Sequence, residues 1–129
     1  MGLTFDTGAL IGLERSRHHM RKVFDVAVTH DVRITVPAVV VAEWWRLGRK
    51  EKERAKLLRA VAIEAIDDRL ARLAGVALSL VPRAQTIDAL VMASASQRAN
   101  EIVYTSDPGN LEALRAGVPQ LASIRIERA

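Results

Sequence analysis

Apolar residues follow two different spacings along the chain, and the two spacings alternate. Short apolar runs that are rich in β-branched residues or alternate with polar ones indicate strands, and apolar residues three and four positions apart indicate helices. The first spacing predicts strands at residues 3–6, 33–36, 63–66, 101–105 and 124–126. The second spacing predicts helices at residues 9–13, 16–29, 38–47, 50–62, from 67 onward, 87–99 and 111–116.

Strands that alternate with helices are typical of βαβ units, in which consecutive strands run parallel and helices cover both faces of the sheet. We therefore predict a three-layer α/β/α sandwich with a mainly parallel sheet. The chain has no internal repeat, linker or low-complexity tract, and its 129 residues are enough to bury one core. Residues 1–129 are expected to form a single domain.

Two of the predicted strands end on an aspartate. The first, at residues 3–6, closes on Asp6, and the strand at 101–105 is followed within two residues by Asp107. The carboxyl ends of parallel strands lie at one edge of the sheet, where ligands bind, so the two carboxylates converge if their strands are neighbours. Asp88 opens the helix that leads into the second strand, and it therefore belongs to the same edge.

A fourth acid, Glu43, lies between apolar neighbours in the predicted helix 38–47, where a glutamate is uncommon unless it is paired or binds a cation. Carboxylates within a few ångströms of one another repel: at an effective dielectric constant of ~20, a pair at ~4 Å is destabilised by about 4 kcal/mol. Such a cluster either takes up protons or binds divalent cations.

Oxygen ligands without cysteine favour Mg²⁺ or Mn²⁺, and a site of this kind suits in-line attack on a phosphodiester. The alternative for each aspartate is a helix cap or a turn residue. Three such residues at one sheet edge, together with Glu43, would be an uncommon coincidence.

Cysteine is absent, which excludes disulfides and thiolate metal sites and favours a reducing compartment. The longest apolar run, Leu73–Pro82, is far shorter than the ~20 residues that span a bilayer. The start of the chain has no basic segment ahead of an apolar one, as a signal peptide would have. We therefore predict a cytoplasmic protein without membrane association.

The net charge of +4 and the sequence pI near 10.1 favour a polyanionic partner. The segment Arg46–Arg59 holds seven basic residues against Glu51 and Glu53. It could follow an RNA backbone toward the acids, or it could be a solvated helix face. Just before it, Trp44 and Trp45 cannot face one direction on a helix, so we expect one to pack inward and the other to lie on a subunit or partner surface.

Four short motifs, in this order, resemble the PIN domain family. They are Phe5-Asp6-Thr7, Pro37 followed after five residues by Glu43, Ile87-Asp88-Ala89-Leu90-Val91-Met92-Ala93, and Tyr104-Thr105-Ser106-Asp107. In size the chain is similar to the VapC-type toxins of bacterial VapBC toxin–antitoxin modules. The resemblance covers the chain from Leu3 to the last predicted strand.

The resemblance implies a five-stranded parallel sheet and RNA cleavage that depends on Mg²⁺ or Mn²⁺. Its catalytic, metal-binding acids correspond to Asp6, Glu43, Asp88 and Asp107. Thr105 and Ser106 match polar positions that would orient ligands or water around the metal. Asn110 stands where many members carry a further aspartate, and asparagine binds metal less well, so the choice between one and two metal ions stays open.

The resemblance further implies a toxin role, cuts that leave a 3′-hydroxyl and a 5′-phosphate, a small cognate antitoxin that fills a groove beside the site, and a homodimer. A non-catalytic PIN-like module that binds RNA or a protein stays an alternative. A phosphoacceptor receiver module also gathers acids at strand ends, but it does not fit, because Asp6 has no acidic neighbour and no lysine follows Lys56.

Overall fold

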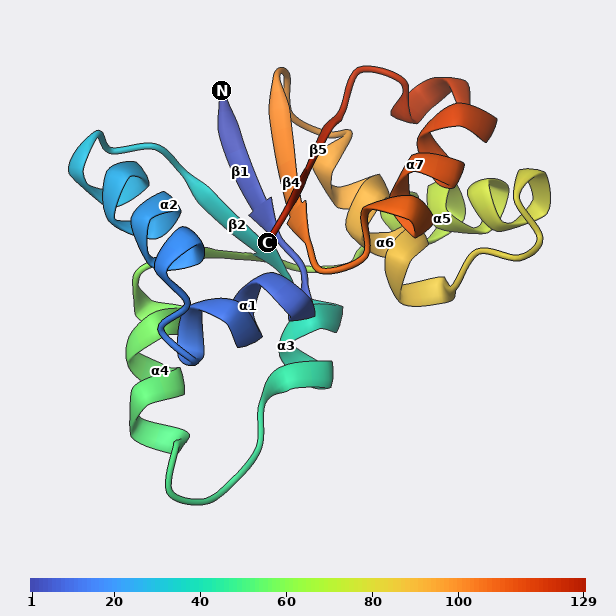
Figure 1. Cartoon of the computed structure of the whole chain (residues 1–129). Helices are drawn as coiled ribbons and strands as arrows, with labels where there is room; N and C mark the ends of the chain where they lie inside the picture. The colour runs from blue at the N-terminus through green and yellow to red at the C-terminus, as the bar shows by residue number, and fades with distance from the viewer.

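In a computed structural model that describes all 129 residues, a five-stranded sheet forms the centre of the molecule (Figure 1). Its strands are β1 (Gly2–Phe5), β2 (Ile34–Pro37), β3 (Ala62–Glu64), β4 (Glu101–Thr105) and β5 (Arg125–Arg128). All neighbouring strands pair in parallel, in the order β3-β2-β1-β4-β5. The predicted parallel, five-stranded sheet is therefore confirmed.

β1 lies between β2 and β4 at the centre of this order. Its pairing with β4 runs from Gly2 opposite Glu101 to Phe5 opposite Tyr104. The chain builds from β1 toward β3, then crosses back and builds from β4 toward β5, so the strand order reverses between β1 and β4. In open α/β sheets, ligands bind at the carboxyl edge where this reversal occurs.

Helices cover both faces of the sheet, which completes the predicted three layers (Figure 1). They are α1 (Thr7–Glu14), α2 (His18–Thr29), α3 (Ala38–Trp44), α4 (Glu51–Arg59), α5 (Asp68–Leu80), α6 (Thr86–Ala95) and α7 (Pro108–Gly117), with a short 3₁₀ turn at Pro119–Leu121. α2 lies over the face that carries Leu3 and Ile102. On the opposite face, Ser94 of α6 donates a hydrogen bond to Glu64.

The central strands β1 and β2 are buried along their whole length, as expected for strands covered on both faces. Large core side chains come from both helix layers and from β1, and they include Phe5, Leu10, Met20, Met92 and Leu111. The edge strands β3 and β5 stay partly exposed. No helix combines the length and apolar character needed to cross a membrane.

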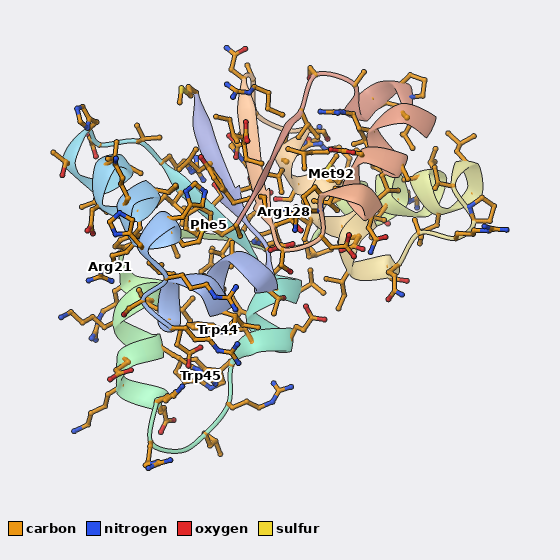
Figure 2. All side chains as sticks on the ribbon, in the orientation of Figure 1. Phe5, Arg21, Trp44, Trp45, Met92 and Arg128 are labelled. Carbon is orange, nitrogen blue, oxygen red and sulfur yellow. The ribbon has the colours of Figure 1, made fainter.

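The sequence predicted that this helix ends at residue 47, but α3 ends at Trp44. Trp45 has an extended backbone (φ −65°, ψ 132°), and the Arg54 guanidinium donates to the carbonyl oxygen of Trp44 (3.1 Å). Trp44 is 3% exposed and Trp45 half-buried (Figure 2), so the expectation that one ring packs inward is confirmed. A partner surface for Trp45 stays a prediction.

Other element boundaries also differ from the prediction; α4, for example, ends at Arg59 rather than at residue 62. α6 ends at Ala95 rather than at residue 99, because the Ser96 hydroxyl donates to the carbonyl oxygen of the preceding turn (2.7 Å) and competes with helix continuation. β3 covers Ala62–Glu64 rather than 63–66: Ile63 is 50% exposed, and Glu64 turns inward to bind Arg98. β5 covers residues 125–128 rather than 124–126.

Candidate active site at the carboxyl edge of the sheet

Asp6 follows β1 directly and begins α1. Its Oδ1 accepts a hydrogen bond from the Ala9 amide (2.9 Å), and its own amide donates to the carbonyl oxygen of Tyr104 in β4 (3.2 Å). The residue is only 9% exposed, and this burial raises the pKa of its carboxyl group, although hydrogen bonds from Thr105 and from the first turn of α1 oppose the rise. Asp6 is thus both a helix cap and a buried acid, and the two readings of the sequence are compatible.

Gly8 allows the first turn of α1 to lie against the end of β4. A Cβ atom at this position would be 2.9 Å from the backbone nitrogen of Ser106, closer than such contacts occur in proteins. Thr105 is buried beside it, and its hydroxyl oxygen accepts from the Asp107 amide (3.1 Å). Because Thr105 also hydrogen-bonds to Asp6, it links the acids that follow β1 and β4.

Glu43 reaches the same edge from α3. The sequence suggested a buried glutamate, but Glu43 is exposed, because α3 buries Val40 and Trp44 on its other side. The Thr7 hydroxyl, in the first turn of α1, donates a hydrogen bond to Glu43 Oε1. Thr7 therefore orients this carboxylate, a role that its place after Asp6 did not reveal.

Asp88 lies in the first turn of α6 and shows that the four acids converge. Burial of this half-exposed carboxyl group is the largest cause of its raised pKa, and the charges of Asp6, Asp107 and Glu43 raise it further. The structure therefore brings together the four acids that the sequence singled out.

Asp107 is exposed at the end of β4, and α7 begins directly after it at Pro108. Asn110 lies inside the first turn of this helix and does not cap it: its Nδ2 donates to Asp107 Oδ2 (2.9 Å). Ser106 lies between β4 and α7, and its carbonyl oxygen accepts from the Arg128 guanidinium (3.2 Å). Asn110 thus acts on Asp107 rather than on the helix backbone.

None of the four acids forms an ion pair with a lysine or arginine. Their donor atoms are carboxylate oxygens, with the Thr7 and Thr105 hydroxyls and the Asn110 amide beside them. No group of three or more histidine or acidic side chains lies in an arrangement that could hold a metal ion. The donor atoms are nonetheless all oxygen, as Mg²⁺ and Mn²⁺ prefer, and Mg²⁺ usually keeps several waters and takes only one or two protein carboxylates.

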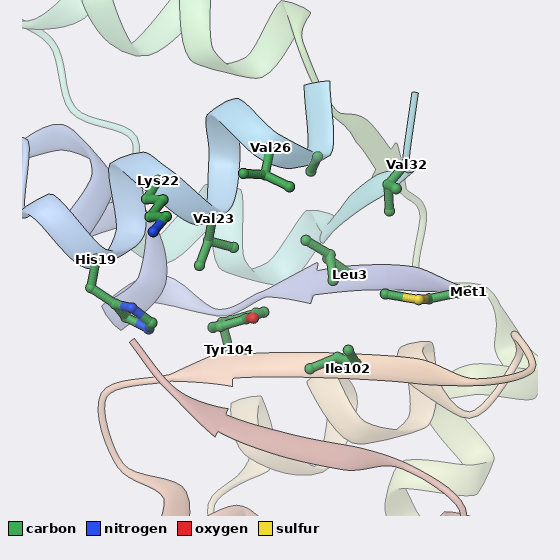
Figure 3. A pocket seen from close by; sticks show the side chains of 10 residues that line it. Met1, Leu3, His19, Lys22, Val23, Val26, Val32, Ile102 and Tyr104 are labelled. Carbon is green, nitrogen blue, oxygen red and sulfur yellow. The ribbon is translucent and has the colours of Figure 1, made fainter. Parts of the chain in front are cut away.

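Two cavities differ in their relation to this edge. The larger one, about 420 Å³, is a mainly apolar groove between α2 and the sheet, lined by residues such as Leu3, Val26 and Tyr104, and none of the four acids borders it (Figure 3). A smaller cavity of about 190 Å³ is bordered by Thr7 and Glu43 and so adjoins the acidic cluster.

Comparison with known proteins agrees with this geometry. The sequence profile of the PIN domain matches residues 3–115. Among curated protein sequences, no match is found.

Solved structures with the same fold include a chain of the DNA-bound VapBC complex from Salmonella typhimurium, with a TM-score of 0.72, 16% identity, and coverage of 99% of this chain and 98% of that chain. VapBC2 from Rickettsia felis bound to a promoter DNA fragment gives a TM-score of 0.74 at 15% identity, with coverage of 100% and 99%. FitAcB from Neisseria gonorrhoeae gives 0.71 at 18% identity, with coverage of 96% and 95%.

Proposed function

Because the chain belongs to the PIN domain family, whose members are generally nucleases, we propose that it is a metal-dependent endoribonuclease that hydrolyses RNA phosphodiester bonds. One observation carries the proposal: four carboxylates from β1, α3, α6 and the end of β4 meet at one sheet edge without a cationic partner. Uncompensated acids of this kind are a common feature of functional sites.

Asp6, Glu43, Asp88 and Asp107 would hold Mg²⁺ or Mn²⁺, which when bound supplies Lewis acidity toward a phosphodiester and its attacking water. Asp6 is fixed by the Ala9 amide and by Thr105, so its carboxylate keeps one orientation. Thr7 fixes Glu43, and Asn110 fixes Asp107. Each of these contacts restrains an acid before any ligand arrives, which reduces the ordering that binding requires.

The test is cleavage of RNA by the purified chain, with and without Mg²⁺, followed by mapping of the cut ends. The variant Asp6→Asn keeps an oxygen that can accept from Ala9, so it should fold but lose Mg²⁺-dependent cleavage. Asp68→Asn is the matched control, because Asp68 is an exposed carboxylate on α5 that pairs only with Arg72. Unchanged cleavage by Asp6→Asn would contradict the proposal, as would equal losses in both variants.

We also propose that the chain is the toxin of a VapBC-type pair, with a small antitoxin as its partner. Support comes from its PIN family membership, from the solved structures of the same fold described as VapBC complexes, and from the apolar groove of about 420 Å³ beside the exposed Val26. Expression of the chain alone should arrest growth of a bacterial host, and Asp6→Asn should not. Light scattering of the purified chain tests the homodimer that belongs to the same proposal.

A further inference from the structure

The cavity of about 190 Å³ that adjoins the acidic cluster is lined by charged residues of both signs, with Glu14 among the acids. Thr7 and Glu43 border it on the side of the acids. Three cations, Arg15, Lys50 and Arg54, border it as well. They come from the end of α1, from the turn before α4 and from α4 itself. The cations therefore line a cavity that adjoins the candidate active site.

Arg54 is not available to a ligand. Its Nη2 and Nε donate to Glu14 Oε1 (2.9 and 3.2 Å), its Nη1 donates to the Trp44 carbonyl oxygen, and its guanidinium carbon lies 5.2 Å from the centre of the Trp44 ring. The side chains of Arg54 and Glu14 are 16% and 5% exposed. This arrangement holds α4 against α1 and α3, and it neutralises Glu14.

Arg15 and Lys50 keep donors that the fold does not use. Lys50 is 58% exposed, and its only ionic contact is with Glu14 (Nζ to Oε1, 3.4 Å), whose charge Arg54 already balances. Arg15 is exposed, and its side chain has no hydrogen bond or ion pair. Arg15 thus has no side-chain partner, and Lys50 shares its single partner, Glu14, with Arg54, so both cations that line the cavity keep free donors.

From this arrangement we propose that Arg15 and Lys50 bind the RNA phosphate next to the scissile one. The proposal rests on the proposed ribonuclease function. Glu43 lines the same cavity and repels a phosphate, so a phosphate that enters the cavity lies at the two cations and its neighbour along the backbone lies toward the acids. Contacts of this kind go to the backbone and do not read sequence. The part of the basic segment 46–59 that faces RNA is then Lys50 and not Arg54, and Arg15 joins it from α1.

Binding of a short fluorescein-labelled single-stranded oligoribonucleotide tests this proposal. Fluorescence anisotropy is measured at several salt concentrations, with every protein carrying Asp6→Asn so that the RNA is not cut. Arg15→Gln with Lys50→Gln should weaken binding and reduce the slope of log K against log salt by about 0.7, the contribution of one phosphate contact with a single strand. In the chain that retains Asp6 and can cleave RNA, the two substitutions Arg15→Gln and Lys50→Gln should raise KM for cleavage and leave kcat nearly unchanged.

The matched control is Arg33→Gln with Arg72→Gln, which removes the same charge from two exposed residues that border neither cavity nor acids. If both pairs change the slope equally, or neither changes it, the proposal is wrong. A ribonuclease that needs Asp6 would still stand in that case, and the basic cavity would be left to a protein partner. If the unmodified chain neither binds nor cleaves RNA, both proposals fail. Thermal melting checks that the Arg15 and Lys50 variants fold, as expected from the intact pair of Arg54 and Glu14.

Discussion

Two groups of carboxylates differ in how the fold treats their charge. At the carboxyl edge of the sheet, Asp6 and its three acidic neighbours have no lysine or arginine partner. Beneath α6, Glu64 and Glu101 lie on either side of Arg98, which donates to Glu64 Oε2 through Nη1 (3.0 Å) and to Glu101 Oε2 through Nε (2.8 Å). The second group is deeper, since the Glu101 side chain is 1% exposed, and yet it has its cation.

The pKa values of Glu14 and Asp88 differ in the same way, because Glu14 has an arginine partner and Asp88 has none. Burial alone would raise the pKa of Glu14, but hydrogen bonds from Arg54 and Trp44 outweigh it, and the pKa is lowered. For Asp88, burial and the neighbouring carboxylates act in one direction, and the pKa is raised. Glu14, Glu64 and Glu101 each have an arginine partner, so the cluster of four acids without one is the candidate for a bound cation.

The largest expected effect follows from removing Arg98, the cation that pairs with Glu64 and Glu101. Arg98→Met leaves the buried Glu101 and the partly exposed Glu64 without a cation, and it should lower the free energy of unfolding by about 3–5 kcal/mol in urea titrations. Arg72→Met is the matched control: its pair with Asp68 is about four-fifths exposed, and its loss should be below ~1 kcal/mol. Adding Glu101→Gln to Arg98→Met should recover part of the loss. Equal effects of the two arginine variants would show that the buried arginine has no special role.

A divalent cation should stabilise the chain only through the four acids at the carboxyl edge of the sheet, which have no lysine or arginine partner. Mn²⁺ at 100 times its dissociation constant should stabilise the chain by about 2.7 kcal/mol, because it binds the folded state and not the unfolded one. Asp6→Asn should remove most of this gain, whereas Asp68→Asn should keep it. The measurement is thermal melting with and without MnCl₂. A gain that survives in Asp6→Asn would place the cation elsewhere.

Removing one charge from the acidic site should stabilise the fold while it stops the reaction. Because the pKa of Asp88 is raised in the folded chain, the folded state holds a proton that the unfolded state has already lost above the ordinary value of 3.8. Stability therefore falls as pH rises from that value through the folded pKa. Asp88→Asn should be more stable than the natural chain at pH 7, by less than about 1 kcal/mol since solvent screens a half-exposed group.

At acidic pH, below 3.8, this difference should vanish, because Asp88 is then protonated in both states. Denaturation at a series of pH values measures the effect. Lower stability of Asp88→Asn at pH 7 would mean that the carboxylate has a stabilising partner in the free protein.

The acidic site was predictable because its geometry follows from sheet direction. Asp6 and Asp107 end strands that the sequence marked clearly, and parallel strands put their ends at one edge. The two acids converge only if β1 and β4 are neighbours, and in the structure these two strands pair directly. Glu43 came from family resemblance, and its exposure was not foreseen because three valines precede it in α3.

The sequence could not predict the long-range pairs of Arg98 with Glu64 and of Arg54 with Glu14. Arg98 and Glu64 are 34 residues apart, and Arg54 and Glu14 are 40 apart, so no local spacing links them. The sequence predicted Glu64 as a polar position of an alternating strand over residues 63–66, whereas in the structure Glu64 pairs with Arg98 and β3 covers Ala62–Glu64. Because these ion pairs join distant segments, the sequence does not show which acids have an arginine partner and which do not.

The smallest effect concerns the rim of the acidic site, where Asn110 donates to Asp107 (2.9 Å). Asn110→Asp replaces this donor by a fifth carboxylate, so without metal it should reduce stability by about 0.5 kcal/mol, a value suited to an exposed hydrogen bond. With Mn²⁺ the order should reverse, and the variant should gain more stability from the cation than the natural chain does. Asn100→Asp adds the same charge in the turn before β4, at the opposite edge of the sheet, and should show no such gain. If Mn²⁺ stabilises Asn110→Asp no more than the natural chain, residue 110 lies outside the reach of the metal, and Asn110 serves only to orient Asp107.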